Sequence, residues 1–137
     1  MMLHKTAQLQ FEFIPEAKAI LVTATHKFIP GADFKAAFET LLTKLDGLGA
    51  TRMVFDKREL TVFDQQAMTW YNLEWKPRAY AAGITRHVKL LPQNEVFRKS
   101  MEIGKLRIQR EHPEFDYAKY QISYSESLEA ALGVGVA

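Results

Sequence analysis

The sequence predicts an α/β fold with a mixed, mostly parallel sheet of about five strands and helices on the faces of that sheet. Two observations lead to this prediction. Short apolar segments of strand length alternate along the chain with longer segments in which apolar residues recur every three or four positions. Glycine or proline marks most of the changes between them. Strands that alternate with helices favour parallel pairing through right-handed crossovers.

Two strands are expected first. Residues 9–13 alternate apolar with polar side chains, which is typical of a strand with one buried face. Residues 19–25 form a nearly continuous apolar run, which is typical of a strand covered on both faces. A turn at residues 15–17 separates the two segments. We therefore expect an antiparallel hairpin whose second strand lies near the centre of the sheet.

A first helix is expected to begin near Gly31 and to end at Gly47 and Gly49, because glycine commonly follows the last turn of a helix. Its apolar residues fall on one continuous stripe, formed by Phe34, Phe38, Leu41, Leu45 and Leu48. Residues 52–56 then form a short apolar strand that ends on an aspartate.

The second half of the chain continues the alternation. Asp64 is expected to cap a helix that Pro77 breaks or kinks, since proline has no backbone N–H to donate. The remaining elements are a strand at residues 84–91, a helix at 95–112, a strand at 120–124 and a last helix capped by Ser125.

The composition limits the classes of protein. A chain of 137 residues fits one domain over residues 1–137, and 47% hydrophobic residues are enough for a core without a metal or disulfide. The absence of cysteine excludes disulfides and thiolate chemistry and favours a cytoplasmic location. No apolar run is long enough for a membrane span, and a net charge of +2 does not favour nucleic-acid binding. The four histidines lack metal-site spacing, so we expect no metal and no cofactor.

Four segments carry a resemblance to a known family. They are the leading hairpin, the strand at residues 52–56, the tract from Trp70 to Gly83, and a tyrosine-rich strand followed at once by residues 125–131. This pattern resembles the SpoIIAA-like branch of the STAS superfamily, which includes domains described as STAS or CRAL-TRIO-like. The resemblance extends over most of the chain and implies the fold of the anti-sigma-factor antagonists.

One departure from that family concerns its regulatory switch. The antagonists carry an Asp-Ser-Ser-Gly type of sequence after the strand that corresponds to residues 53–56, and its serine is phosphorylated. Residues 60–67 of this chain contain neither serine nor glycine. The phosphorylation switch therefore cannot be transferred to this chain.

Polar residues follow the predicted strands at the edge where ligands of α/β sheets usually bind. Those selected as a candidate rim for a polar or anionic ligand are His26, Asp56, Lys57 and Arg58. Lysine and arginine at this rim can donate charge-assisted hydrogen bonds to an anion. The alternative interpretation is a solvated turn in which the aspartate caps nearby backbone groups.

An aromatic tract is the most unusual local feature of the sequence. Trp70, Tyr71 and Trp75 precede Pro77, beside the expected kink. Large rings at this place can line an apolar ligand cavity, form a dimer surface, or fill the core under a broken helix. The sequence leaves these three interpretations open.

The leading functional hypothesis is a non-enzymatic STAS-like module that binds an unknown protein partner or a small molecule and can form a homodimer. No residue set in the sequence supports bond-making chemistry. The first alternative is a small-molecule or lipid carrier, which requires an apolar cavity of some hundreds of Å³. The second is a hydrolase or transferase that uses His26 and Asp56, which requires the two side chains to lie within hydrogen-bond reach.

Overall fold

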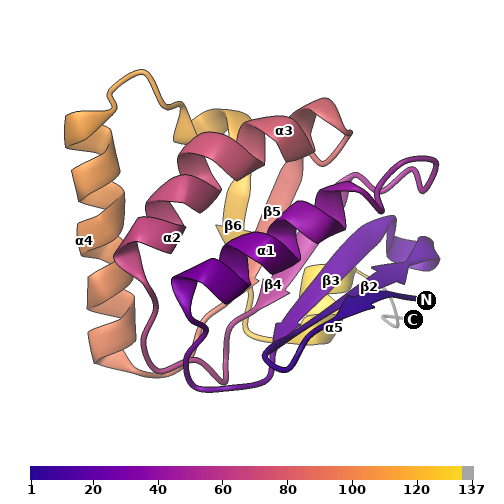
Figure 1. Cartoon of the computed structure of the whole chain (residues 1–137), viewed down its shortest axis with the longest axis horizontal. Helices are drawn as coiled ribbons and strands as arrows, with labels where there is room; N and C mark the ends of the chain where they lie inside the picture. The colour runs from indigo at the N-terminus through magenta and orange to yellow at the C-terminus, as the bar shows by residue number, and fades with distance from the viewer. Residues whose placement is uncertain (134–137) are drawn as a thin grey trace.

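A computed structural model of the chain describes residues 1–133 and consists of one six-stranded mixed sheet with helices on both of its faces (Figure 1). The strands lie side by side in chain order. They are β1 (Met2–Lys5), β2 (Leu9–Ile14), β3 (Ala19–Ala24), β4 (Arg52–Asp56), β5 (Arg86–Leu90) and β6 (Ile122–Tyr124). β1, β2 and β3 pair antiparallel, and the pairs from β3 to β6 are parallel. The predicted α/β class and the leading hairpin are confirmed.

The first strand was not among the predicted elements. β1 pairs with β2 at the edge of the sheet, and its register shifts between Met2 and His4. Its side chains are exposed or only partly buried, so its sequence lacks the alternation that indicates a strand with one buried face. Pairing with β2 and the packing of Leu3 against the main core hold this segment in place.

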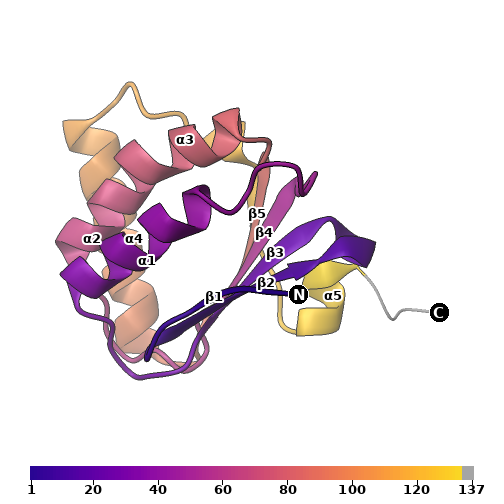
Figure 2. The same cartoon turned by 45° about the vertical axis from the view of Figure 1, so that its right-hand side comes forward.

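The helices are divided unequally between the two faces of the sheet (Figure 2). α1, α2, α3 and α4 cover one face, here called the helix face, and the short α5 covers part of the other. Their bounds are α1 (Gly31–Leu42), α2 (Gln65–Trp70), α3 (Lys76–Ala81), α4 (Glu95–Glu111) and α5 (Leu128–Leu132). No helix within residues 1–133 has both the length and the hydropathy that crossing a membrane requires.

The main core lies between the sheet and the helix face. β2 directs Leu9, Phe11 and Phe13 into it, as the alternation of that strand predicts. Phe38 of α1 meets these side chains from the other side and is fully buried. A smaller apolar cluster lies under α5, so that β4 and β5 are buried on both faces.

α1 is shorter than its apolar stripe predicts, because it ends at Leu42 and not near Gly47. Leu45 is nevertheless buried, and it packs on the same core from the turn that follows the helix. The stripe therefore correctly identifies core residues, although it overstates the length of the helix.

Pro77 was predicted to break or kink its helix, and the break does not occur, because the helix continues through it. α2 and α3 are joined by η2 (Tyr71–Trp75), a π-helical turn, and Figure 1 shows one uninterrupted helical run. The backbone N–H of Lys76 donates to the carbonyl of Tyr71, five residues earlier. Proline cannot donate and collides with the carbonyl four residues before it. The wider π turn accommodates the pyrrolidine ring of Pro77 without ending the helix.

The caps are predicted correctly at one helix and wrongly at another. Asp64 caps α2 as expected, and its Oδ1 accepts from the backbone N–H of Ala67 at 2.9 Å. At α5 the cap is Ser127 and not Ser125, since Ser127 Oγ accepts from the N–H of Ala130 at 3.2 Å. The strand before it is preceded by a 3₁₀ turn, η3 (Tyr117–Tyr120).

Candidate ligand-binding cavity

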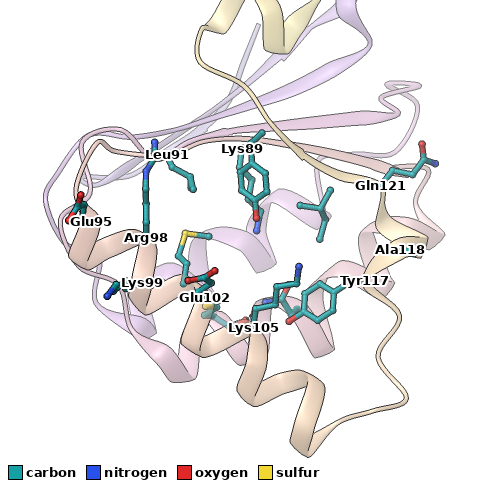
Figure 3. A pocket seen from close by; sticks show the side chains of 15 residues that line it. Lys89, Leu91, Glu95, Arg98, Lys99, Glu102, Lys105, Tyr117, Ala118 and Gln121 are labelled. Atoms are coloured by element: carbon teal, nitrogen blue, oxygen red, sulfur yellow. Dashed lines mark hydrogen bonds between the residues drawn. The ribbon is translucent and has the colours of Figure 1, made fainter.

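A cavity of about 900 Å³ lies between α4 and the edge of the sheet formed by β5 and β6. The volume is within the range of pockets that hold small organic ligands. Residues from α2, η2 and η3 complete the walls, and exposed side chains of α4 stand at the opening. Figure 3 shows Lys89, Glu102, Lys105 and Tyr117 directed toward this space.

The alternation of β5 places two basic residues on the helix face. His87 and Lys89 pair with Met53 and Phe55 of β4, which belong to the main core, whereas Val88 packs in the cluster under α5. Only 1% of His87 and 5% of Lys89 is exposed. Lys89 lines the cavity, and none of the ion pairs of residues 1–133 involves it.

The π turn contributes further polar groups to the same region. Lys76 is fully buried, its ammonium lies 5.2 Å from the ring centroid of Tyr71, and its Nζ has no hydrogen-bond partner within residues 1–133. Asn72 is also buried and lines the cavity; its Nδ2 donates to the carbonyl of Met68 at 3.1 Å, while its Oδ1 is unpaired. π turns inside α-helices occur frequently at functional sites.

Lys57 approaches the same interior from the end of β4. Part of its surface is exposed, but its ammonium lies 4.8 Å from the ring centroid of Phe55, on the helix face. Burial, and then the charge of Lys89, hold the pKa of Lys57 well below its usual value. His87, Lys89, Lys76 and Lys57 are called the basic cluster below.

The members of the basic cluster destabilise one another's charged forms. Burial, followed by the charge of Lys105, lowers the pKa of Lys89 to about 8. Burial and the neighbouring lysines lower the pKa of His87 to about 2 and hold that of Lys76 well below its usual value. Both ring nitrogens of His87 lack a partner within residues 1–133. The interior therefore has an excess of positive charge or of neutral amine, and Asp56, the acid that is buried within residues 1–133, pairs with Arg58 instead.

The opening of the cavity carries more charge and two phenols. Arg98 and Lys105 project from α4, and Arg98 Nε donates to the carbonyl of Pro92 at 2.9 Å. Glu102 is an exposed carboxylate on the same helix. Burial, and then the charge of Tyr124, raise the pKa of Tyr117 to about 12, and its hydroxyl is unpaired within residues 1–133. These donors are suited to binding an anion.

The structure does not bring the predicted polar rim together. His26 is exposed, and its Nδ1 lies 3.1 Å from Thr25 Oγ1. Asp56 lies on the face of α5 and accepts three hydrogen bonds from Arg58: from the backbone N–H to Oδ1 at 3.1 Å, from Nε to Oδ1 at 2.9 Å and from Nη2 to Oδ2 at 2.8 Å. No hydrogen bond or ion pair joins His26 to Asp56 in the described part of the chain. Of the four rim residues, only Lys57 reaches the helix face.

The aromatic tract is mainly core. Trp75 is fully buried, Tyr71 is 3% exposed and stacks on it at a centroid distance of 5.2 Å, and Trp70 is half-buried. Burial raises the pKa of the Tyr71 hydroxyl. The cleft beside Tyr71 has a volume of about 40 Å³, which is room for a few waters at most. This cleft is too small for an organic ligand.

Sequence analysis did not select the residues that line the cavity, although two signals were present. Residues 84–91 are a predicted strand with His87 and Lys89 two positions apart, so both point to the same face of the sheet. Lys76 directly precedes a proline inside a helix, where the hydrogen-bond ladder must be irregular. Charged residues on a buried face call for a partner, and this argument would have led to the cavity.

No protein-family model matches the chain, and no curated protein or solved structure was found to be similar to it. The geometry of the cavity is therefore the basis for proposing a function.

Proposed function

We propose that this chain is a cytoplasmic, non-enzymatic STAS-like module that binds a small organic anion in the cavity between α4, β5 and β6. One observation carries the proposal: Lys89 is almost fully buried, lines a cavity of about 900 Å³, and pairs with no carboxylate within residues 1–133. The mixed sheet with its leading hairpin supports the STAS-like part.

The charge of Lys89 is energetically unfavourable in the protein without ligand. Burying an ammonium group without a counterion costs several kcal/mol, which lowers its pKa. A carboxylate or phosphate group of a ligand supplies the missing charge and restores the protonated form. Lys105 at the opening adds a second donor.

The apolar part of the lining specifies the rest of the ligand. Met68, Leu91, Met101 and Ile122 contribute side chains to the wall of the cavity. Their burial against a ligand favours a molecule with an apolar body and one anionic end. A free inorganic ion would leave this surface in contact with water.

The two alternative functions have less support. A carrier with a closed apolar cavity finds too little space in the cleft of about 40 Å³ at Tyr71. The cavity of about 900 Å³ is large enough, but charged residues such as Lys89, Glu102 and Lys105 line it. A hydrolase or transferase that uses His26 and Asp56 requires a contact between them, and Asp56 is bound to Arg58 instead.

Isothermal titration calorimetry tests the proposal with two anionic probes and one neutral probe. Phenyl phosphate and phenylacetate represent the two anion classes, and phenol is the uncharged control. We expect one of the anions to bind with 1:1 stoichiometry and at least about tenfold more tightly than phenol. Lys89→Met should weaken this binding about tenfold or more, because it removes the buried donor and keeps a similar stem.

The matched control is Lys44→Met, which makes the same substitution at an exposed position after α1. It should leave the affinity unchanged. Equal affinity for anion and phenol, or equal losses in both variants, would contradict the proposal.

A further inference from the structure

Lys89 differs from the other lysines of the described chain in combining burial, access to a ligand-sized cavity and a strand that holds it rigidly. β5 is paired on both sides, by β4 and by β6. Lys76 is buried more deeply but does not line the cavity. Lys99 and Lys105 line it from the exposed side of α4. An amine with these three properties is placed to react with a bound molecule as well as to attract it.

Its environment also increases the fraction of the amine that is in the neutral, reactive form. Burial and Lys105 lower the pKa of Lys89 to about 8, so at neutral pH it provides on the order of a hundredfold more free amine than an ordinary lysine. Neither Glu95 nor Glu102, the two carboxylates at the cavity, forms an ion pair with it. At pH 7 about a tenth of Lys89 is therefore the free amine, whose lone pair can attack a molecule in the cavity.

We propose that Lys89 binds ligands that carry an aldehyde or ketone beside their anionic group by forming an imine with the carbonyl carbon. This inference rests on the proposed function, since the anionic group is what brings the carbonyl to the amine. The ligand class becomes narrower: 2-oxo acids, or phosphorylated aldehydes and ketones, with an apolar body.

The reaction is a reversible condensation. The lone pair of Lys89 Nζ attacks the carbonyl carbon, the nitrogen gives up one proton, and the oxygen takes up one proton, which gives a carbinolamine. The carbinolamine hydroxyl takes up a second proton and leaves as water while the nitrogen forms a second bond to carbon. The nitrogen then loses its remaining proton, which leaves the imine. One water is released, and nothing is oxidised or reduced. Glu102, a carboxylate, and Tyr117, a protonated phenol, line the same cavity and can move these protons.

The two lysines that the proposal uses, one to bind the anionic group and one to form the imine, lie on opposite sides of the cavity. Lys89 approaches from the sheet, and Lys105 approaches from α4 and stands over the ring of Tyr117 at 5.2 Å (Figure 3). When Lys105 binds the anionic group of a short ligand, the carbonyl carbon of that ligand is directed toward Lys89. Proximity of this kind greatly accelerates an otherwise bimolecular addition.

Pyridoxal phosphate with borohydride reduction is the test, because the probe contains both an aldehyde and a phosphate. Borohydride converts the imine into a stable secondary amine, which peptide mass mapping assigns to one lysine. At low probe concentration we expect Lys89 to be labelled at least about tenfold more than any other lysine. Pyridoxal, which lacks the phosphate, should label Lys89 much less, and phenyl phosphate should protect it.

Three variants make the test decisive. Lys89→Met should lose the label, and Lys44→Met should keep it. Lys89→Arg keeps the charge and cannot form an imine, so it should bind phenyl phosphate by calorimetry and show no label at this position. Circular dichroism verifies that each variant is folded.

Two failures are distinguishable. If phenyl phosphate or phenylacetate binds but the label is spread evenly over exposed lysines, the imine is overturned and the anion-binding function stands. If neither anion binds and the label is also spread evenly, both are overturned.

Discussion

The indole N–H of Trp75 donates a 2.8 Å hydrogen bond to the backbone carbonyl of Phe38, and this bond joins the π turn to α1. The two rings also meet edge to face, with centroids 5.1 Å apart. A buried tryptophan that satisfies a helix carbonyl has a role in the core, so binding of a ligand is not needed to explain it.

Trp75→Phe should therefore destabilise the fold by about 2–4 kcal/mol, because it leaves a void and removes the hydrogen bond to the Phe38 carbonyl. Urea unfolding followed by circular dichroism measures this loss. Trp70→Phe is the matched control: Trp70 is half-buried, and its replacement should cost less than about 1 kcal/mol. Equal effects of the two substitutions would contradict the assignment of Trp75 to the core.

The pair of Asp56 and Arg58 leads to a second prediction. Arg58→Ala should leave the affinity for phenyl phosphate within about twofold, because the guanidinium is bound to Asp56 on the face of α5, away from the cavity. Its effect on stability should also be small, about 1 kcal/mol at most, since the Arg58 side chain is 47% exposed. If Arg58→Ala lost as much affinity as Lys89→Met, the result would indicate that the anion binds at the predicted polar rim and not in the cavity.

Patterns that depend on local sequence were sufficient for most of the fold. Alternation in residues 9–13 and the helical spacing after Gly31 identify the core-facing residues, because burial imposes the same period on the sequence. The strand at residues 52–56 is predicted with its observed bounds, since apolar residues occupy a short segment between a loop and a charged turn. β1 is missed because its side chains are exposed or only partly buried, so no alternation marks it in the sequence.

The site was harder to predict for two physical reasons. A proline usually interrupts a helix, and nothing local distinguishes that case from a π turn that Trp75 anchors through tertiary contacts. The convergence of Lys89 and Lys105 depends on where α4 stands relative to the sheet edge, which is a property of packing. The selected rim residues failed to converge because Asp56 and Lys57, adjacent in a strand and its exit, point to opposite faces.

Because buried Lys89 has no counterion in the protein without ligand, replacing it with an apolar residue should make the protein more stable. Lys89→Met should raise the free energy of unfolding at pH 7 by about 1–3 kcal/mol, because it replaces a buried, unpaired ammonium with an apolar side chain of similar length. Lys44→Met should change it by less than about 0.5 kcal/mol. A destabilised Lys89→Met protein would indicate that the lysine has a structural partner.

The stability that Lys89→Met gains over the wild-type protein should depend on pH, and the pKa of Lys89 determines the direction of the change. The pKa of Lys89 is about 8 in the folded chain, below the value near 10.4 expected when unfolded. Between these values the unfolded chain binds the proton and the folded chain does not, so wild-type stability should rise with pH from about 8 to 10. The advantage of Lys89→Met should shrink over the same range, which urea titrations at several pH values measure.

Binding of the anion should show the opposite trend with pH, because the anion requires the protonated lysine. Phenyl phosphate keeps the same charge above pH 7, since the second pKa of a phosphate ester is near 6. Of the groups that face Lys89, His87 stays neutral with a pKa of about 2, and Tyr117 stays protonated with a pKa of about 12. Neither changes its charge between pH 7 and pH 9.

The affinity for phenyl phosphate should therefore fall about tenfold or more from pH 7 to pH 10, as Lys89 loses its proton. Near pH 8.5 binding should take up protons, which calorimetry in buffers of different ionisation enthalpy counts directly. Lys89→Arg should bind with little dependence on pH, because a guanidinium stays charged throughout. An affinity of the wild-type protein that is constant over this range would mean that the anion is held by the permanently charged Arg98 at the opening, and that Lys89 contributes no charge to the site.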